Sequence, residues 1–194
     1  MAAEGGFEKC VHIVLGWILA DGWHHELHAV DDMGHQAIHM ASKEGHDAVV
    51  SVLIREHANI DSRTNDKSTS LLLATKNGHV NVVQTLLKNN ANPYLSDKTG
   101  ETPFQWALFK KREELIDILL PAQINYTSSV NLVVDGTTQQ PLQHKNNAGE
   151  TLLISSVKNK FQRVAKQLID AGANIDDQTI NGDTADRKST RLNS

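Results

Sequence analysis

The sequence has little cysteine, few aromatic residues and no long apolar run. Cys10 is the one cysteine in 194 residues, so an intrachain disulfide and a cysteine-based zinc finger are both excluded, and we expect a reducing compartment. The longest apolar run, residues 13–20, is far shorter than the roughly 20 residues of a membrane helix. It also lacks the basic flank and cleavage site of a secretion signal. We therefore expect a soluble chain without membrane insertion, cytoplasmic or alternatively nuclear.

A strong charge of either sign is also missing. The formal net charge is −4 and charged residues make up 22% of the chain, so composition favours neither nucleic acid nor an anionic membrane as partner. The segment 109–114, "FKKREE", alternates in charge over a short distance. This pattern favours a solvated turn and helix start over a phosphate-binding site.

Catalytic signatures are lacking as well. No nucleophile-plus-base arrangement is suggested, and the glycine-rich stretches fit neither a phosphate loop nor a dinucleotide fingerprint. We therefore expect a monomeric protein that is not an enzyme and uses no cofactor.

The chain is organised by an internal repeat. The stretches that begin at Gly34 and Lys67 align without gaps at an offset of 33 residues, further copies begin at Gly100 and Gly149, and a partial copy opens at Gly182. Each full copy has four apolar residues at positions i, i+1, i+4 and i+5, which form one stripe of a helix. These quartets are Val49-Val50-Leu53-Ile54, Val82-Val83-Leu86-Leu87, Leu115-Ile116-Leu119-Leu120 and Val164-Ala165-Leu168-Ile169.

A shorter helix is expected before each quartet. A small residue near its middle lets two antiparallel helices approach closely; these residues are Ala41, Ala74, Ala107 and Ser156. Candidate N-caps are Thr69, Thr102, Thr151 and Thr184, with Gln36 as a weak one, and Pro103 follows its cap in the first turn. One helix pair cannot bury its apolar face alone, so the sequence predicts an all-α solenoid of stacked pairs.

The period and its motifs resemble the ankyrin repeat. The characteristic four-residue motif stands here as Gln36-Ala37-Ile38-His39, Thr69-Ser70-Leu71-Leu72, Thr102-Pro103-Phe104-Gln105 and Thr151-Leu152-Leu153-Ile154. The resemblance covers residues 31–185. It implies helix–turn–helix–β-turn units with a concave face that binds other proteins, so we expect a protein partner, whose identity the repeats do not specify.

The repeat boundaries predict a series of segments. Residues 1–30 are interpreted as a degenerate N-terminal repeat and junction, followed by repeats at 31–63, 64–96, 97–145 and 146–178 and a truncated repeat at 179–185. Residues 186–194, "DRKSTRLNS", match one reading frame of a common sequencing adapter, so we interpret them as a non-native tail; the alternative is a genuine basic tail. We expect the natural coding region to continue past residue 185.

The repeat at 97–145 contains an insertion. In residues 126–145, β-branched residues flank Asp135-Gly136, a strong hairpin-turn signal. We predict a β-hairpin there, either as a tolerated loop or as a binding element.

A narrower resemblance involves residues 93–120 and the preceding stretch 74–89. They are similar to the ankyrin region of the mind bomb family of E3 ubiquitin ligases, most distinctively at Lys110–Glu114. This resemblance implies a scaffold fragment of an enzyme that ubiquitinates Notch ligands. The fragment lacks the catalytic RING, which needs about seven cysteines. A purely structural spacer is the third alternative.

Three histidines are explained by their repeat positions. His39 ends its four-residue motif, and the resemblance implies that its ring hydrogen-bonds backbone groups at a repeat junction. His46 and His79 follow the glycine of the turn between helices, so we interpret all three as structural. His35 lies on the β-turn side and is a candidate contact residue.

The other dense histidine group falls in the irregular junction. His24, His25 and His28, with Glu26 among them, lack the spacer of a His-Glu-x-x-His zinc motif and a fixed third ligand. We interpret this segment as a solvated linker beside Trp17 and Trp23 and predict no metal site; metal binding is the alternative.

Candidate partner contacts lie at the β-turn tips and on the exposed side of the shorter helices. They are Asp32, Met33, His35, Lys43, Glu44, Asn65, Asp66, Ser68, Lys76, Asn77, Lys98, Thr99, Glu101, Phe109, Lys110, Asn147, Ala148 and Glu150. Phe109 stands out because aromatic residues are enriched among interface hot spots. The alternative is that Phe109 packs beneath the insertion.

Overall fold

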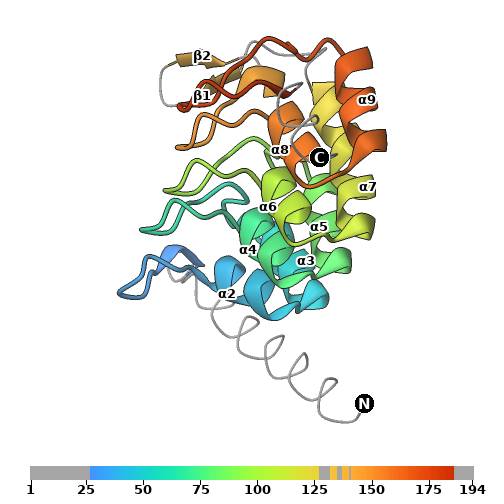
Figure 1. Ribbon diagram of the computed structural model, residues 1–194. Coiled ribbons are helices and arrows are strands. Elements are labelled where there is room, and N and C mark those ends of the chain that lie inside the picture. Colours follow the sequence, from blue (N-terminus) through green and yellow to red (C-terminus); the bar gives the residue numbers. More distant parts are fainter. Residues whose placement is uncertain (1–26, 127–131, 135–136, 140, 186–194) are drawn as a thin grey trace, which may run out of the picture. The chain divides into compact units, whose positions relative to one another are not determined.

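The computed structural model describes residues 27–126, 132–134, 137–139 and 141–185. The chain forms two compact units, Met1–Asn92 and Pro93–Ser194, and each is considered by itself. The described residues contain eight α-helices and two short strands (Figure 1). The fold is an all-helical repeat, as the sequence predicts. None of the described helices has the length and apolar character that a bilayer crossing requires.

Unit 1 contains two helix pairs. Their bounds are Ala37–Glu44 (α2), Asp47–Arg55 (α3), Ser70–Asn77 (α4) and Val80–Lys88 (α5). We call the first helix of each pair the inner helix (α2, α4) and the second the outer helix (α3, α5). The two inner helices pack on each other, the two outer helices do likewise, and each inner helix packs on the outer helix of its own pair (Figure 1). The side chains of Ile38, Leu53 and Leu86 are almost fully buried between them, so neighbouring repeats share one apolar core.

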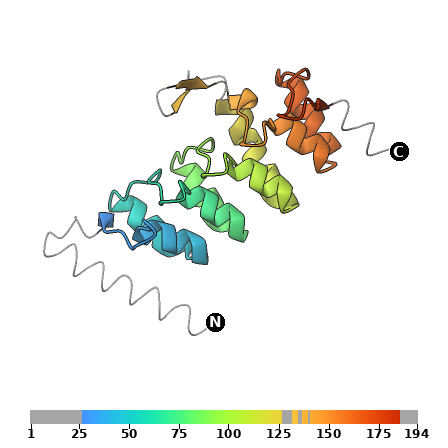
Figure 2. The same ribbon diagram turned by 60° about the vertical axis from the view of Figure 1, so that its left-hand side comes forward.

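Unit 2 repeats this pattern with an insertion. Its helices are Pro103–Phe109 (α6), Glu113–Tyr126 (α7), Leu152–Lys158 (α8) and Gln162–Asp170 (α9), with a short 3-10 helix at Pro141–Gln143 (η2). Figure 2 shows the α6–α7 and α8–α9 pairs. Helix α6 packs on both α7 and α8, and η2 contacts α7 and α8.

Two strands lie within the insertion. Leu132–Val134 (β1) pairs antiparallel with Thr137–Gln139 (β2), with Val133 opposite Thr138. The turn expected at 135–136 lies outside the described residues, and α7 extends to Tyr126, into the span assigned to the insertion. A hairpin across all of 126–145 stays a prediction.

The inner helices begin at the expected caps. The hydroxyl oxygens of Thr69, Thr102 and Thr151 each accept a hydrogen bond from the backbone N–H three residues later, at 3.3, 3.4 and 3.4 Å. Pro103 occupies the first position of α6. At Gln36 the backbone N–H instead donates to the His39 ring, at 3.0 Å, so here the motif histidine satisfies the helix start.

The apolar pattern is buried with one systematic exception. The small residues Ala41, Ala74, Ala107 and Ser156 are buried, which allows the inner helices to approach their neighbours closely. The first three positions of every quartet are buried, but the fourth varies, from 4% exposed at Leu120 to 47% at Ile169. The expectation of a uniform four-residue stripe is therefore too broad, because the fourth position lies at the margin of the helix contact.

The turn between inner and outer helix has a left-handed residue in both units. In unit 1 it is glycine, Gly45 and Gly78, with φ of 81° and 86°. In unit 2 the equivalent residues are Lys111 and Lys160, with φ of 54° and 67°. A side chain in this conformation costs energy that glycine avoids, so the turns between the paired helices are strained in unit 2 and relaxed in unit 1.

Candidate protein-binding surface

The β-turn tips are held by side-chain oxygens at their bases. Asp31 Oδ1 accepts from the backbone N–H groups of Met33 and His35 at 2.9 and 2.7 Å. Asp97 and Asn146 close their turns in the same way, each with one side-chain oxygen and the N–H groups two and four residues later. Donation from the His35 N–H also lowers the pKa of Asp31. Each tip therefore has a defined shape before any partner binds.

Consecutive tips are also joined to each other. The backbone N–H of Asn65 donates to the Met33 carbonyl at 3.0 Å, and its side-chain amide donates to the Asp32 carbonyl at 3.0 Å. In unit 2 Asn147 makes the same pair of bonds, to the carbonyls of Thr99 and Lys98 at 3.1 and 3.0 Å. The two asparagines, named as candidate contacts, therefore align the tips within each unit.

The residues whose side chains close the β-turns were not predicted from the sequence, although the sequence contains a signal for them. Asp31, Asp97 and Asn146 each lie three residues before a glycine of positive φ. Asp or Asn in this position is typical of a turn closed by its own side chain. The pattern occurs at the same place in three of the repeats and would have identified them.

Phe109, at the end of α6, has an exposed aromatic side chain. It is 65% exposed, and it meets the Trp106 ring edge-on, with centroids 5.7 Å apart and an interplanar angle of 89°. Lys110 Nζ lies 5.9 Å from the Trp106 centroid and 5.8 Å from that of Phe109. We call Trp106, Phe109 and Lys110 the aromatic patch. The alternative in which Phe109 is covered by the insertion is wrong.

The aromatic patch is tied to the neighbouring turn. Trp106 Nε1 donates to Asp97 Oδ2 at 3.0 Å, while the other oxygen of Asp97 closes the turn. Asp97 is 5% exposed. Its carboxylate accepts hydrogen bonds from internal donors and is not accessible to a partner. One carboxylate thereby positions both the tip and the indole ring.

Trp106 itself was not among the predicted contacts. It occupies the same repeat position as Met40 and Leu73, and Met40 is 42% exposed. An apolar residue recurring on the otherwise polar side of the inner helix was the available signal.

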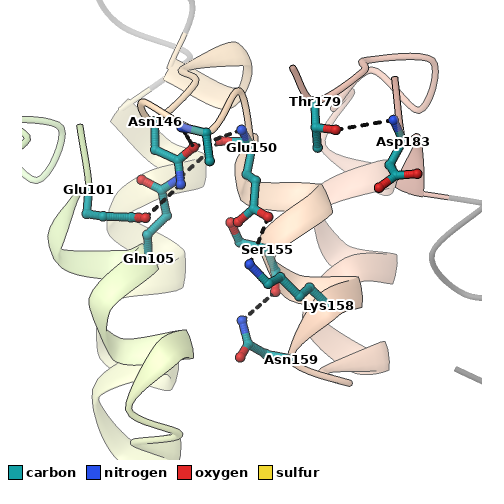
Figure 3. A network of polar contacts seen from close by, with 10 residues as sticks. Glu101, Gln105, Asn146, Glu150, Ser155, Lys158, Asn159, Thr179 and Asp183 are labelled. Atoms are coloured by element: carbon teal, nitrogen blue, oxygen red, sulfur yellow. Dashed lines mark hydrogen bonds and ion pairs between the residues drawn. The ribbon is translucent and has the colours of Figure 1, made fainter. Parts of the chain in front are cut away.

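A polar network joins α6 to the turn before α8 (Figure 3). Asn146 Nδ2 donates to Glu101 Oε1 at 2.6 Å, and the Gln105 amide donates to the Glu150 carbonyl at 3.3 Å. Lys158 Nζ lies 2.9 Å from Glu150 Oε1. Burial raises the pKa of Glu101, and the nearby charges of Glu150 and Asp97 add to this. The network therefore holds two repeats together within unit 2.

His39 and Gln105 perform the same structural role. His39 Nδ1 accepts from the N-cap N–H of Gln36, and Nε2 lies 2.8 Å from the Ser62 carbonyl. Gln105 Oε1 accepts from the N-cap N–H of Thr102 at 3.0 Å, and its amide donates to the next repeat. The His39 ring must therefore carry its proton on Nε2 when neutral, and burial lowers its pKa.

The other histidines lie as follows. His79 Nε2 is 2.9 Å from the Lys43 carbonyl, a structural contact between neighbouring repeats, and His46 precedes α3. The half-buried His35 ring lies 3.0 Å from the Asp31 carboxylate. His24 and His25 lie outside the described residues, and His28 is exposed. Within the described ranges no three metal-ligating side chains gather.

The predicted contact residues differ in exposure. Ser68 and Glu150 are 3% and 8% exposed, so the prediction of direct contact through their side chains is wrong. His35, Lys76 and Glu101 are half-buried. Exposed are Asp32, Met33, Lys43, Glu44, Asn65, Asp66, Asn77, Lys98, Thr99, Phe109, Lys110, Asn147 and Ala148.

The outer helices of unit 2 form a separate shallow cavity. It has a volume of about 350 Å³ and is lined by Asp117, Leu120, Pro121, Ile124, Arg163 and Gln167. Arg163 and Asp117 form an ion pair beside it. This volume is at the lower end for a small-molecule site, and the cavity shares no residue with the aromatic patch.

A family model described as ankyrin repeats (3 copies) matches residues 1–97 and again residues 38–130. No curated protein matches the chain. The likeness to the mind bomb ligases therefore stays a prediction.

Proposed function

We propose that this chain, which belongs to the ankyrin repeat family, binds a partner protein through the inner-helix and turn-tip surface of unit 2, with the aromatic patch at its centre. Ankyrin repeats are generally protein–protein interaction modules. The turn tips and inner helix of unit 1, with Met33, Met40 and Lys43, form a secondary contact area. The proposal assigns no chemistry to the chain.

The exposure of Phe109 carries the proposal. A phenylalanine 65% exposed costs hydrophobic free energy in water, which a partner recovers on burial. The ring is also already oriented, because Trp106 packs against its edge and Asp97 fixes Trp106. A preoriented aromatic side chain loses little entropy on binding, which is what an interface hot spot requires.

Capture of partners from an extract of the source organism tests this. Phe109→Ala should lose proteins that the parent chain retains, because truncating a hot spot costs about 2 kcal/mol or more. Ile169→Ala is the matched control: it removes an exposed apolar side chain from the outer helix α9 of the same unit and should retain them.

The spacer alternative makes the opposite prediction. If the array only separates other modules, replacing Lys43, Lys76, Phe109 and Lys110 together by alanine leaves every captured protein in place, and the proposal is then wrong. The ligase alternative is tested separately, by sequencing the full transcript: RING-type cysteine and histidine spacing supports it, and a transcript without that spacing rejects it.

A further inference from the structure

The charges around the aromatic patch are unequally exposed. Lys98, Lys110 and Lys111 are exposed, whereas Asp97 is buried and Glu101 is half-buried. Asp97 accepts from Thr99, Glu101 and Trp106, and Glu101 accepts from Asn146. The carboxylates of Asp97 and Glu101 are thus held by internal donors, whereas Lys110, beside the two rings, is exposed.

Lys110 has no carboxylate partner among the described residues. Lys110 Nζ lies over the rings of Trp106 and Phe109, 5.9 and 5.8 Å from their centroids. A cation–π contact at this distance on an exposed surface is worth only about 0.5–1 kcal/mol, and it leaves the ammonium donors available. The nearest exposed carboxylates in sequence, Glu113 and Glu114, belong to the first turn of the outer helix α7, where they complement the helix dipole.

The surface of unit 2 thus combines a preoriented apolar ring with an adjacent cation that has no carboxylate partner in the described part of the chain. From this we infer that its ligand is a peptide segment in which a large apolar or aromatic side chain lies next to a carboxylate. The apolar side chain packs against Phe109, and the carboxylate pairs with Lys110. This inference rests on the proposed function and specifies the chemistry of the partner.

A single-stranded nucleic acid also combines a stacking ring with a negative charge. The formal net charge of −4 disfavours it, because nucleic-acid affinity comes mainly from multiple phosphate contacts by a strongly basic surface. An acidic peptide needs only one ion pair at the aromatic patch and does not require a strongly basic surface. A peptide is therefore favoured over a nucleic acid as the ligand.

Selection from a displayed library of random 12-residue peptides against the full chain tests the inference. Enriched peptides should carry Asp or Glu within two positions of Trp, Phe or Leu. For a fluorescein-labelled enriched peptide, Phe109→Ala should weaken binding by about tenfold or more, as for a central hot spot. Ile169→Ala should leave the dissociation constant within about twofold, as an exposed residue outside the contact does.

Reversing the charge of Lys110 tests the predicted ion pair directly. Lys110→Glu should lower the affinity for the acidic peptide by about tenfold or more. A matched peptide with Lys in place of the acidic residue should bind the variant more tightly than it binds the parent chain. Circular dichroism of each variant confirms that it is folded. Enriched peptides that lack acidic residues, or whose binding is unchanged by Lys110→Glu, overturn the inference.

Two further outcomes separate the inference from the proposed function. If a dT12 oligonucleotide binds as tightly as the peptide and loses affinity in the same variants, the ligand is a nucleic acid and the inference is wrong. If no peptide is enriched but Phe109→Ala still loses captured proteins, the peptide chemistry is wrong and the protein-binding function stands. If neither assay responds to Phe109→Ala, both fail.

Discussion

The two units make the same repeat junction from different side chains. In unit 1 the His39 ring joins the start of α2 to the Ser62 carbonyl, and in unit 2 the Gln105 amide joins the start of α6 to the Glu150 carbonyl. Each side chain offers one acceptor and one donor at similar reach, and both are almost fully buried. The junction therefore requires a particular hydrogen-bonding geometry more than a particular residue, and only the histidine version titrates.

Truncating either junction residue should have the largest effect. His39→Ala and Gln105→Ala each remove the hydrogen bond to the N-cap N–H and the one to the carbonyl at the repeat junction, and leave both groups without that partner, so we expect a loss of about 3 kcal/mol for each. Urea unfolding followed by circular dichroism measures this. Met40→Ala, which truncates the neighbouring exposed residue of α2, should cost far less. A loss at one junction but not at the other would break the equivalence of the two units.

The helix turn of unit 1 should be the next most sensitive site. At Gly45 a Cβ would lie 2.5 Å from His79 Nδ1, and the His79 ring cannot move away without losing its bond to the Lys43 carbonyl. We expect Gly45→Ala to cost about 2 kcal/mol or more, from backbone strain and this clash together. In Gly172→Ala the φ is equally positive but nothing lies within 4 Å, so only the strain of about 1 kcal/mol applies. Equal losses in thermal melts would show that the His79 contact is unimportant.

The corresponding turn of unit 2 should respond in the opposite direction. Lys111 is held at φ 54°, so Lys111→Gly should raise the free energy of unfolding by roughly 0.5–1 kcal/mol, net of the greater freedom of glycine in the unfolded chain. Lys110→Gly is the matched control: Lys110 has φ −80°, so glycine brings no relief and should destabilise. If Lys111→Gly also lowers the free energy of unfolding, the Lys111 side chain stabilises the fold by more than the strain of its positive φ costs.

The smallest effect we predict is a difference in pH dependence. Burial holds the pKa of His39 below its ordinary value of 6.5, so below about pH 6.5 the unfolded chain takes up a proton that the folded chain does not. The stability that His39 contributes is therefore complete above pH 6.5 and declines as the pH falls toward the folded-state pKa.

Reciprocal exchange isolates this effect. His39→Gln should cost less stability at pH 5.5 than at pH 7.5, because the parent alone loses the histidine contribution on acidification. Gln105→His should show the reverse, with a greater cost at the lower pH. Urea midpoints of parent and variants at both pH values provide the comparison, and a cost independent of pH would mean that the His39 pKa is not displaced.

The residues that the sequence identified correctly are those with local requirements. Thr69, Thr102 and Thr151 cap helices through an N–H three residues away, and the quartets follow helical spacing. Both patterns are encoded within one turn of the chain and repeat at a fixed period. His39 was recognisable for the same reason, since its place in a recurring motif specified its surroundings.

The surface residues were predicted less completely, because exposure depends on what other repeats bring near them. Glu150 lies at a position that is exposed in a single turn, but Lys158 and the Gln105 amide cover it. Trp106 was overlooked because its partner Asp97 lies in the preceding turn, nine residues away. A repeat pattern alone does not show which side chain of an inner helix turns toward such a partner.

By itself, the sequence determined the repeat period, the helix starts and the apolar stripes, because each depends on residues within a few positions of one another. Tertiary structure alone decided which charges face the solvent. Asp97, Glu101 and Glu150 are satisfied by N–H and ammonium donors brought to them by folding, whereas Lys110 meets two aromatic faces. A buried carboxylate requires hydrogen-bond donors, and folding places these donors beside the acidic side chains. Phe109 and Lys110 remain exposed on this surface.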